Sequence, residues 1–177
     1  NWAKISDELI EDSALRYEEI DTILFGANTY PFMGEYWQNA EANSNSPTEK
    51  SFAKLINDKK KYVISRKKID LTWRNSEQIL FTDTKSLIEK IQNLKNQTGK
   101  NISVESGVKT WQFFLENKLY DELWLSLQPT IAGAGEKLFY DDFPKSEMKL
   151  SGTKQYQDGV IKLIYQKINN STSLRII

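Results

Sequence analysis

A chain of 177 residues, 39% of them hydrophobic and 27% charged, has the size and composition of one globular α/β domain with a single core. Its 24 basic residues cancel its 24 acidic residues, so no net field attracts nucleic acid or an anionic membrane surface. Because the chain has no Cys and no His, composition alone excludes disulfides, tetrahedral zinc sites, Ser-His-Asp triads and cysteine nucleophiles.

Neither a membrane segment nor a metal site is predicted. No apolar run approaches the roughly 20 residues that span a bilayer, and the first residues lack the pattern of a signal peptide. The carboxylate pairs Asp121-Glu122 and Asp141-Asp142 do not have the spacing of a calcium loop. We therefore expect a soluble, cytoplasmic protein that holds no metal.

The chain begins with a predicted helix and a predicted buried strand. Ser6 is the expected N-cap of a helix over residues 6–18, because apolar residues recur there at helical spacing. The apolar run at 22–26 is short, rich in strand-forming residues and ends at Gly26. This pattern predicts a buried strand that feeds a helix.

A polar segment and three strand–helix pairs follow. Residues 38–47 are small and polar, which predicts a surface loop, and Thr48 is the expected cap of a helix that runs to about Asp58. Three further alternations of strand and helix predict a largely parallel sheet. They are 61–65 before a basic turn, 78–81 before a helix at 84–97, and 102–105 before a helix at 108–118.

The end of the chain carries a different pattern. Three strand-like segments at 122–130, 149–157 and 160–167 follow one another without a helix, and Asp158-Gly159 is a hairpin signal. We expect an antiparallel edge on the parallel sheet. The predicted fold is thus α/β, with a mostly parallel central sheet flanked by helices and an antiparallel C-terminal hairpin. Residues 1–168 form this single domain, and no partner is assigned to the tail at 169–177.

Three strand-to-helix junctions carry small, hydroxyl or basic residues where the free N–H groups of a helix N-terminus face solvent. In α/β sheets such junctions lie at the carboxyl ends of strands, where phosphate-bearing ligands usually bind, and three of them suit a dinucleotide. Taken singly, the glycines could only allow tight turns, and the basic run could be a solvated surface. The candidate residues are Gly26, Ala27, Asn28 and Thr29, then Ser65, Arg66 and Lys67, then Ser106, Gly107, Val108, Lys109 and Thr110.

The order of these motifs resembles the dihydrofolate-reductase-like family. The match runs from the Gly26 junction through Tyr62-Val63-Ile64-Ser65-Arg66 to Ser106-Gly107. Tyr36-Trp37 and the run at 129–139 are most similar to one branch, the reductase domain of riboflavin biosynthesis. In that family a first strand and a substrate-contacting Asp-Gly come earlier, so part of the substrate site is expected outside residues 1–177.

The resemblance implies an NADPH-dependent reductase that transfers hydride to a heterocyclic or pyrimidine-type small molecule, as 5-amino-6-(5-phosphoribosylamino)uracil reductase does. By position, the first junction would meet the cofactor pyrophosphate, Ser65 and Arg66 the adenosine 2′-phosphate, and the third junction the phosphates and the nicotinamide side. Trp37 is the candidate wall of the substrate pocket. The resemblance also implies a homodimer, for which the strands within 149–167 offer a surface.

Two residues depart from the family pattern. Ala27 stands where the family usually has Arg or Lys, and Ser106 replaces the first Gly of a Gly-Gly pair. The missing cation removes a charge-assisted contact, which predicts cofactor binding about tenfold weaker. Two alternatives therefore stay open: a dihydrofolate reductase, and a paralogue that binds a nucleotide or a partner chain without turnover.

Overall fold

The computed structural model describes residues 3–168 and 176–177, and helices alternate with strands over most of this length. None of the described helices is long and apolar enough to cross a bilayer. The elements are α1 (Asp7–Tyr17), β1 (Ile20–Gly26), α2 (Tyr30–Asn43), α3 (Pro47–Asp58), β2 (Lys60–Ser65), β3 (Ser76–Leu80), α4 (Thr84–Lys95), β4 (Asn101–Val104), α5 (Val108–Glu116), β5 (Glu122–Leu127), β6 (Met148–Gln155) and β7 (Ile161–Lys167).

The parallel sheet has the order β3-β2-β1-β4 and is covered on both faces. Successive side chains of a strand point to opposite faces, and β1 shows the consequence. Ile23 and Phe25 join one apolar cluster with α1, α2 and α3, whereas Leu24 joins a second cluster with α4 and α5. A strand buried on both faces needs a continuous apolar run, and the sequence at 22–26 predicted such a strand.

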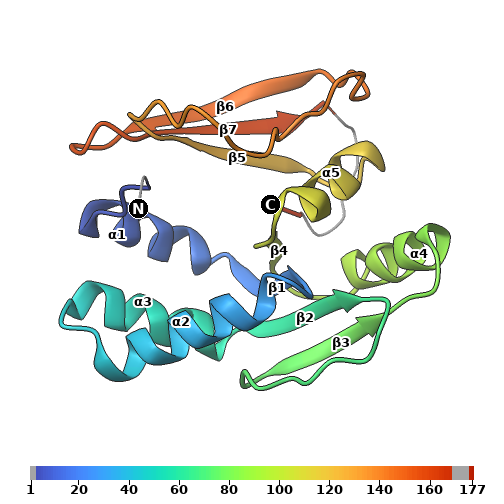
Figure 1. Cartoon of the computed structure of the whole chain (residues 1–177), viewed down its shortest axis with the longest axis horizontal. Coiled ribbons are helices and arrows are strands. Elements are labelled where there is room, and N and C mark those ends of the chain that lie inside the picture. Colours follow the sequence, from blue (N-terminus) through green and yellow to red (C-terminus); the bar gives the residue numbers. More distant parts are fainter. Residues whose placement is uncertain (1–2, 169–175) are drawn as a thin grey trace.

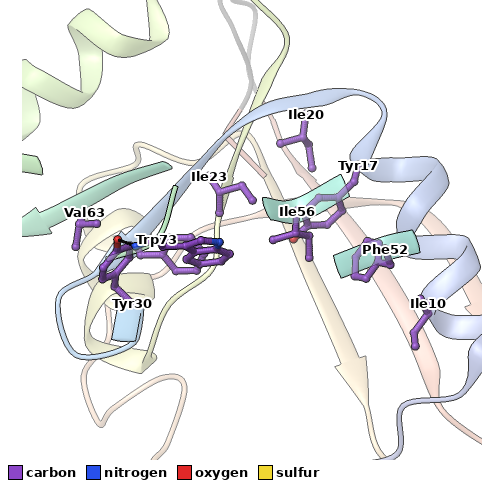
Figure 2. Packing of buried hydrophobic residues seen from close by; sticks show 10 residues of the cluster. Ile10, Tyr17, Ile20, Ile23, Tyr30, Phe52, Ile56, Val63 and Trp73 are labelled. Atoms are coloured by element: carbon purple, nitrogen blue, oxygen red, sulfur yellow. Dashed lines mark hydrogen bonds between the residues drawn. The ribbon is translucent and has the colours of Figure 1, made fainter. Parts of the chain in front are cut away.

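Trp73 lies in the first cluster, where Figure 2 shows it beside Tyr30. Only 1% of Trp73 is exposed, and its indole N–H donates to Asn57 Oδ1 at 2.6 Å, so the buried polar atom is satisfied. The Tyr30 hydroxyl accepts the backbone N–H of Trp73 at 2.9 Å. A Cβ at Gly34 would lie 3.3 Å from the Trp73 ring, a tight contact that would require the ring to shift by a few tenths of an ångström.

The segment expected as a loop at 38–47 is mostly helical, and that expectation was wrong. Helix α2 continues to Asn43 because Ala and Glu residues in this segment are good helix formers despite the lack of an apolar stripe. Ser46, and not Thr48, is the N-cap of α3, and its hydroxyl accepts the Glu49 N–H at 3.2 Å. The predicted cap at Ser6 is confirmed, since its hydroxyl accepts the Leu9 N–H.

The last three strands form a separate antiparallel sheet with the order β5-β7-β6, seen at the top of Figure 1. The predicted hairpin is confirmed, and its Gly159 has a φ of 87° that favours glycine. The expectation that these strands form an edge of the parallel sheet was wrong. The described end of the tail explains why: Ile177 pairs with β4, donating to Ile102 O and accepting from Val104 N at 2.8 Å each, while Ile176 O accepts the Asp121 N–H before β5.

Helix α1 carries polar contacts that hold the antiparallel sheet to the rest of the domain. The Asp12 carboxylate accepts from Lys154 Nζ at 3.1 Å, from the Tyr156 hydroxyl at 2.8 Å and from Lys162 Nζ. Burial alone would raise the pKa of Asp12, but the hydrogen bonds from Lys162, Tyr156 and Lys154 lower it to about 2. We call these four residues the Asp12 cluster.

Candidate functional site

The three predicted junctions surround one cavity of about 730 Å³. Strands β2, β1 and β4 are neighbours and parallel, so their carboxyl ends meet at one edge of the sheet, and the junctions follow those ends directly. The cavity is large enough for a small-molecule ligand or cofactor. The cavity is lined by most of the residues predicted from the sequence: Gly26, Ala27, Asn28, Thr29, Ser65, Arg66, Ser106, Gly107, Val108, Lys109 and Thr110.

Helix α5 begins at the cavity with free backbone donors. Its N-cap is Gly107, which has no side chain to accept an N–H group, and the first-turn residues Val108 and Lys109 line the cavity. The first N–H groups of a helix have no partner within the helix and carry a partial positive charge. This end of the cavity therefore favours an anionic group.

Two hydroxyl groups join the first junction to the third. Ser106 Oγ accepts the Gly26 N–H at 2.9 Å, and Thr29 Oγ1 accepts the Gly107 N–H at 3.1 Å. Each bond crosses from the end of β1 to the end of β4. The two loops are thereby fixed relative to one another before any ligand binds.

The second junction presents Arg66 at the cavity. Ser65 folds the turn, because its hydroxyl accepts the Lys67 N–H at 3.1 Å and donates to the Lys67 carbonyl at 2.7 Å. The Arg66 guanidinium lies 5.5 Å from the centre of the Phe81 ring, which is within cation–π range. Among the described residues no carboxylate pairs with Arg66, so its N–H groups are available for a phosphate.

The rest of the wall was not predicted. Phe81 and Thr84 follow the carboxyl end of β3. The other junctions were identified as the segments that follow strands, and the predicted strand at 78–81 would have indicated these two residues in the same way. Glu136 comes from the long connection between β5 and β6, whose position no local pattern indicates. The remaining lining residues make that side apolar and are Ile64, Leu87 and Phe113.

Two predicted site residues lie away from the cavity. Lys67 does not line it and takes part through its backbone, which orients the Ser65 hydroxyl. Trp37 packs edge-on against Phe52, with ring centroids 5.3 Å apart, and beside the first apolar cluster. Binding roles for both residues stay predictions.

A half-buried carboxylate stands directly before the third junction. Glu105 Oε1 accepts from the Tyr17 hydroxyl and from the Ser103 hydroxyl, both at 2.5 Å. Burial and the charge of Glu105 hold the pKa of Tyr17 well above its ordinary value, so the phenol stays protonated and donates. The network fixes the end of β4 where Ser106 enters the cavity, and no sequence pattern had indicated it.

The amino-acid sequence matches one family model over most of the chain. The family is described as the RibD C-terminal domain, and residues 4–162 are matched. The uncharacterized protein YyaP of Bacillus subtilis (strain 168) is 32% identical over 147 residues, which cover 83% of this chain and 74% of that protein. The uncharacterized YwjB of the same strain is 30% identical over 67 residues, 38% of each chain.

Solved structures share the fold at low sequence identity. A protein of Shewanella sp. PV-4 assigned to riboflavin biosynthesis has a TM-score of 0.65 and 17% identity, with 96% of this chain and 84% of that chain covered. A pyrimidine reductase-like protein of Corynebacterium diphtheriae has a TM-score of 0.57 and 16% identity, covering 90% and 82%. A diaminohydroxyphosphoribosylaminopyrimidine deaminase/5-amino-6-(5-phosphoribosylamino)uracil reductase of Thermotoga maritima has a TM-score of 0.58 and 15% identity, covering 92% and 50%.

Proposed function

Because the chain belongs to the RibD C-terminal domain family, we propose that it is an NADPH-dependent reductase of a heterocyclic or pyrimidine-type small molecule. The observation that carries the proposal is the cavity where three parallel strands end. It is lined by free backbone N–H groups and by a guanidinium that pairs with no carboxylate in the described part of the chain. These groups suit a ligand with several phosphates, as a dinucleotide has. When bound, NADPH supplies the hydride.

The residues present fit the cofactor in two places. The free N–H groups of Val108 and Lys109 at the start of α5 would hold the pyrophosphate. Arg66 would recognise the 2′-phosphate, since a guanidinium can donate two parallel hydrogen bonds to phosphate oxygens. The Phe81 ring holds that guanidinium in place, which reduces the entropy lost on binding.

The chain's own contribution to the reaction is to orient reactants and exclude water. The apolar wall formed by Ile64, Leu87 and Phe113 limits hydration of whatever lies against it. For the substrate we propose a compound of the 5-amino-6-(5-phosphoribosylamino)uracil class, named for the Thermotoga maritima protein of the same fold. Dihydrofolate reduction is the second candidate, and a non-catalytic nucleotide-binding paralogue is the third.

Calorimetric titration with NADPH and NADH tests the cofactor, and Arg66→Ala tests its site. We expect the wild type to prefer NADPH, and Arg66→Ala to lose that preference while its NADH affinity is unchanged. Lys67→Ala is the matched control, because it removes the neighbouring cation, which does not line the cavity. Equal affinities for the two cofactors in the wild type would contradict the proposal.

Turnover separates the three candidates. Oxidation of NADPH with the phosphoribosylamino-uracil substrate supports the first, and oxidation with dihydrofolate supports the second. Tight NADPH binding without oxidation of NADPH by either substrate points to the non-catalytic paralogue.

A cytoplasmic location stays a prediction.

We also propose that the chain forms a homodimer through the face of the antiparallel sheet that points away from α1. Lys162 and Trp124 face α1, so the alternate residues of β7 and β5 lie on the other face. That face leaves Leu127 52% exposed, Ile161 38% and Leu150 48%. Light scattering is expected to give a dimer mass for the wild type and a monomer mass for Leu127→Arg, and a monomeric wild type would overturn the proposal.

A further inference from the structure

Two side-chain hydroxyls of the β4–α5 junction converge on Gly26. A Cβ built on Gly26 would lie 2.7 Å from Ser106 Oγ and 2.7 Å from Thr110 Oγ1. Both residues line the cavity. Glycine at position 26 is therefore required for this arrangement, because a side chain there would displace both hydroxyls.

Neither hydroxyl donates its proton to an acceptor in the described part of the chain. Ser106 Oγ accepts the Gly26 N–H at 2.9 Å but donates to nothing, and Thr110 Oγ1 makes no hydrogen bond there. If the hydroxyls served only to join the two loops, the bond from the Gly26 N–H to Ser106 Oγ would be enough. Two O–H donors are thus left at the wall of the cavity, beside the free N–H groups of α5.

The same wall lacks a cation at the first junction, because position 27 is alanine. Phosphate groups need hydrogen-bond donors, and neutral hydroxyls can supply them where no charged side chain does. The two departures from the family pattern, Ala27 and Ser106, lie on the two loops that the bond from Gly26 to Ser106 joins. Ala27 removes a hydrogen-bond donor from the first junction, and Ser106 adds one at the third.

We propose that Ser106 and Thr110 form a hydroxyl pair that donates to the pyrophosphate of the bound ligand and so replaces the missing cation at position 27. The inference rests on the proposed function for the identity of the ligand as a dinucleotide. The pair distinguishes ligands that carry a diphosphate from those that do not. It does not contact the 2′-phosphate, which Arg66 would recognise at the second junction.

The experiment measures the affinities of NADPH, NADH and inorganic pyrophosphate by calorimetry for Ser106→Ala, Thr110→Val and the double variant. We expect each single change to weaken all three ligands about tenfold, the loss typical of a hydrogen bond to a charged group. The ratio of NADPH to NADH affinity is expected to stay unchanged. Arg66→Ala is expected to change that ratio and leave pyrophosphate binding alone.

Three controls separate recognition from folding. Thr153→Val removes an exposed hydroxyl on β6, away from the cavity, and is expected to change no affinity. Thr110→Ser keeps the hydroxyl and is expected to restore binding that Thr110→Val loses. Ala27→Arg placed in Ser106→Ala is expected to recover the lost affinity, whereas a purely structural role of Ser106 predicts no recovery.

The outcomes for the hydroxyl pair and for the proposed function are distinct. If the wild type binds NADPH but Ser106→Ala and Thr110→Val bind it equally well, the hydroxyl pair is overturned and the proposed function stands. If pyrophosphate binding depends on both hydroxyls but no dinucleotide binds, the pair stands and the proposed function fails. If the wild type binds none of the three ligands, both are overturned.

Discussion

The parallel and antiparallel sheets of this domain are held in place by different forces. Strand β1 of the parallel sheet is apolar on both faces, and its side chains fill two clusters of helices and strands. The antiparallel sheet meets α1 through the charged and hydroxyl groups of the Asp12 cluster and leaves Leu127 and Leu150 exposed on its other face. Apolar burial does not depend on pH, but a carboxylate–ammonium contact does. Strand β1, whose end forms part of the site, is therefore held by apolar contacts that do not depend on pH.

The largest expected effect comes from removing the anion of the Asp12 cluster. Asp12→Ala leaves Lys162, whose side chain is only 10% exposed, without its partner. Breaking a buried ion pair in this way costs about 3–5 kcal/mol, because an uncompensated charge stays buried. Urea unfolding of the variant is expected to show this loss.

An exposed ion pair provides the matched control. Lys137 and Asp141 have side chains 68% and 90% exposed, so Asp141→Ala is expected to cost less than about 1 kcal/mol. Equal losses for the two aspartate variants would mean that α1 and the antiparallel sheet are held together by other contacts.

In the parallel sheet, the free energy of unfolding is expected to fall when buried apolar volume is removed, and not when a charge is removed. Leu24 is fully buried in the second cluster, so Leu24→Ala leaves a cavity and costs about 3 kcal/mol. Leu127→Ala, at a position 52% exposed, is expected to cost under about 1 kcal/mol in the monomer. A large loss at Leu127 that grows with protein concentration would instead support the proposed dimer face.

The sequence predicted the parallel sheet better than the antiparallel one, for a local reason. Strand-to-helix junctions are encoded within a few residues, so the sequence alone could assign Gly26, Arg66 and Ser106 to one edge of a sheet. The turn at Asp158-Gly159 is equally local. Where a contact joins distant residues, no periodicity records it, and the Asp12–Lys162 pair and the bridge from Ile102 to Ile176 were not predicted.

The candidate site shows the same division. The side of the cavity built from strand ends was predicted, whereas Glu136 comes from a long irregular connection and was missed. Lys67 was included as part of the basic run that follows Ser65, but it does not line the cavity. Most of the tail at 169–177 lies outside the described residues, and only its last two residues have an assigned place.

Acid is expected to weaken the antiparallel sheet's attachment before the parallel sheet. The pKa of Asp12 falls from 3.8 to about 2 on folding, so its contribution is fully present above pH 3.8 and is lost as the pH falls through about 2. The shift corresponds to about 2 kcal/mol. Urea midpoints measured between about pH 5 and pH 2 are expected to fall less in Asp12→Asn than in the wild type. Parallel pH profiles for the two proteins would rule out this assignment.

The last expected effect concerns ligand affinity alone, on the parallel sheet. Ala27 is half-buried at the cavity, and its backbone N–H already donates to Ile64 O at 3.2 Å, so Ala27→Arg adds a cation without removing a backbone contact. The new charge joins free N–H groups at the start of α5 that already favour an anion. We expect NADPH to bind more tightly by about 1.5 kcal/mol, the lower end for a hydrogen bond to a charged group, since solvent screens this position.

The dependence on ionic strength identifies the cause of that gain. A contact between charges weakens as salt rises, so the advantage of Ala27→Arg is expected to shrink between low and physiological salt. Ala27→Gln is the control, because it adds length and hydrogen-bonding groups without charge and is expected to show no such dependence. Thermal unfolding of both variants without ligand is expected to match the wild type, since neither change touches a buried group of either sheet. If Ala27→Arg folds normally and binds NADPH no better at low salt, the loop at 26–29 does not face the ligand's phosphates.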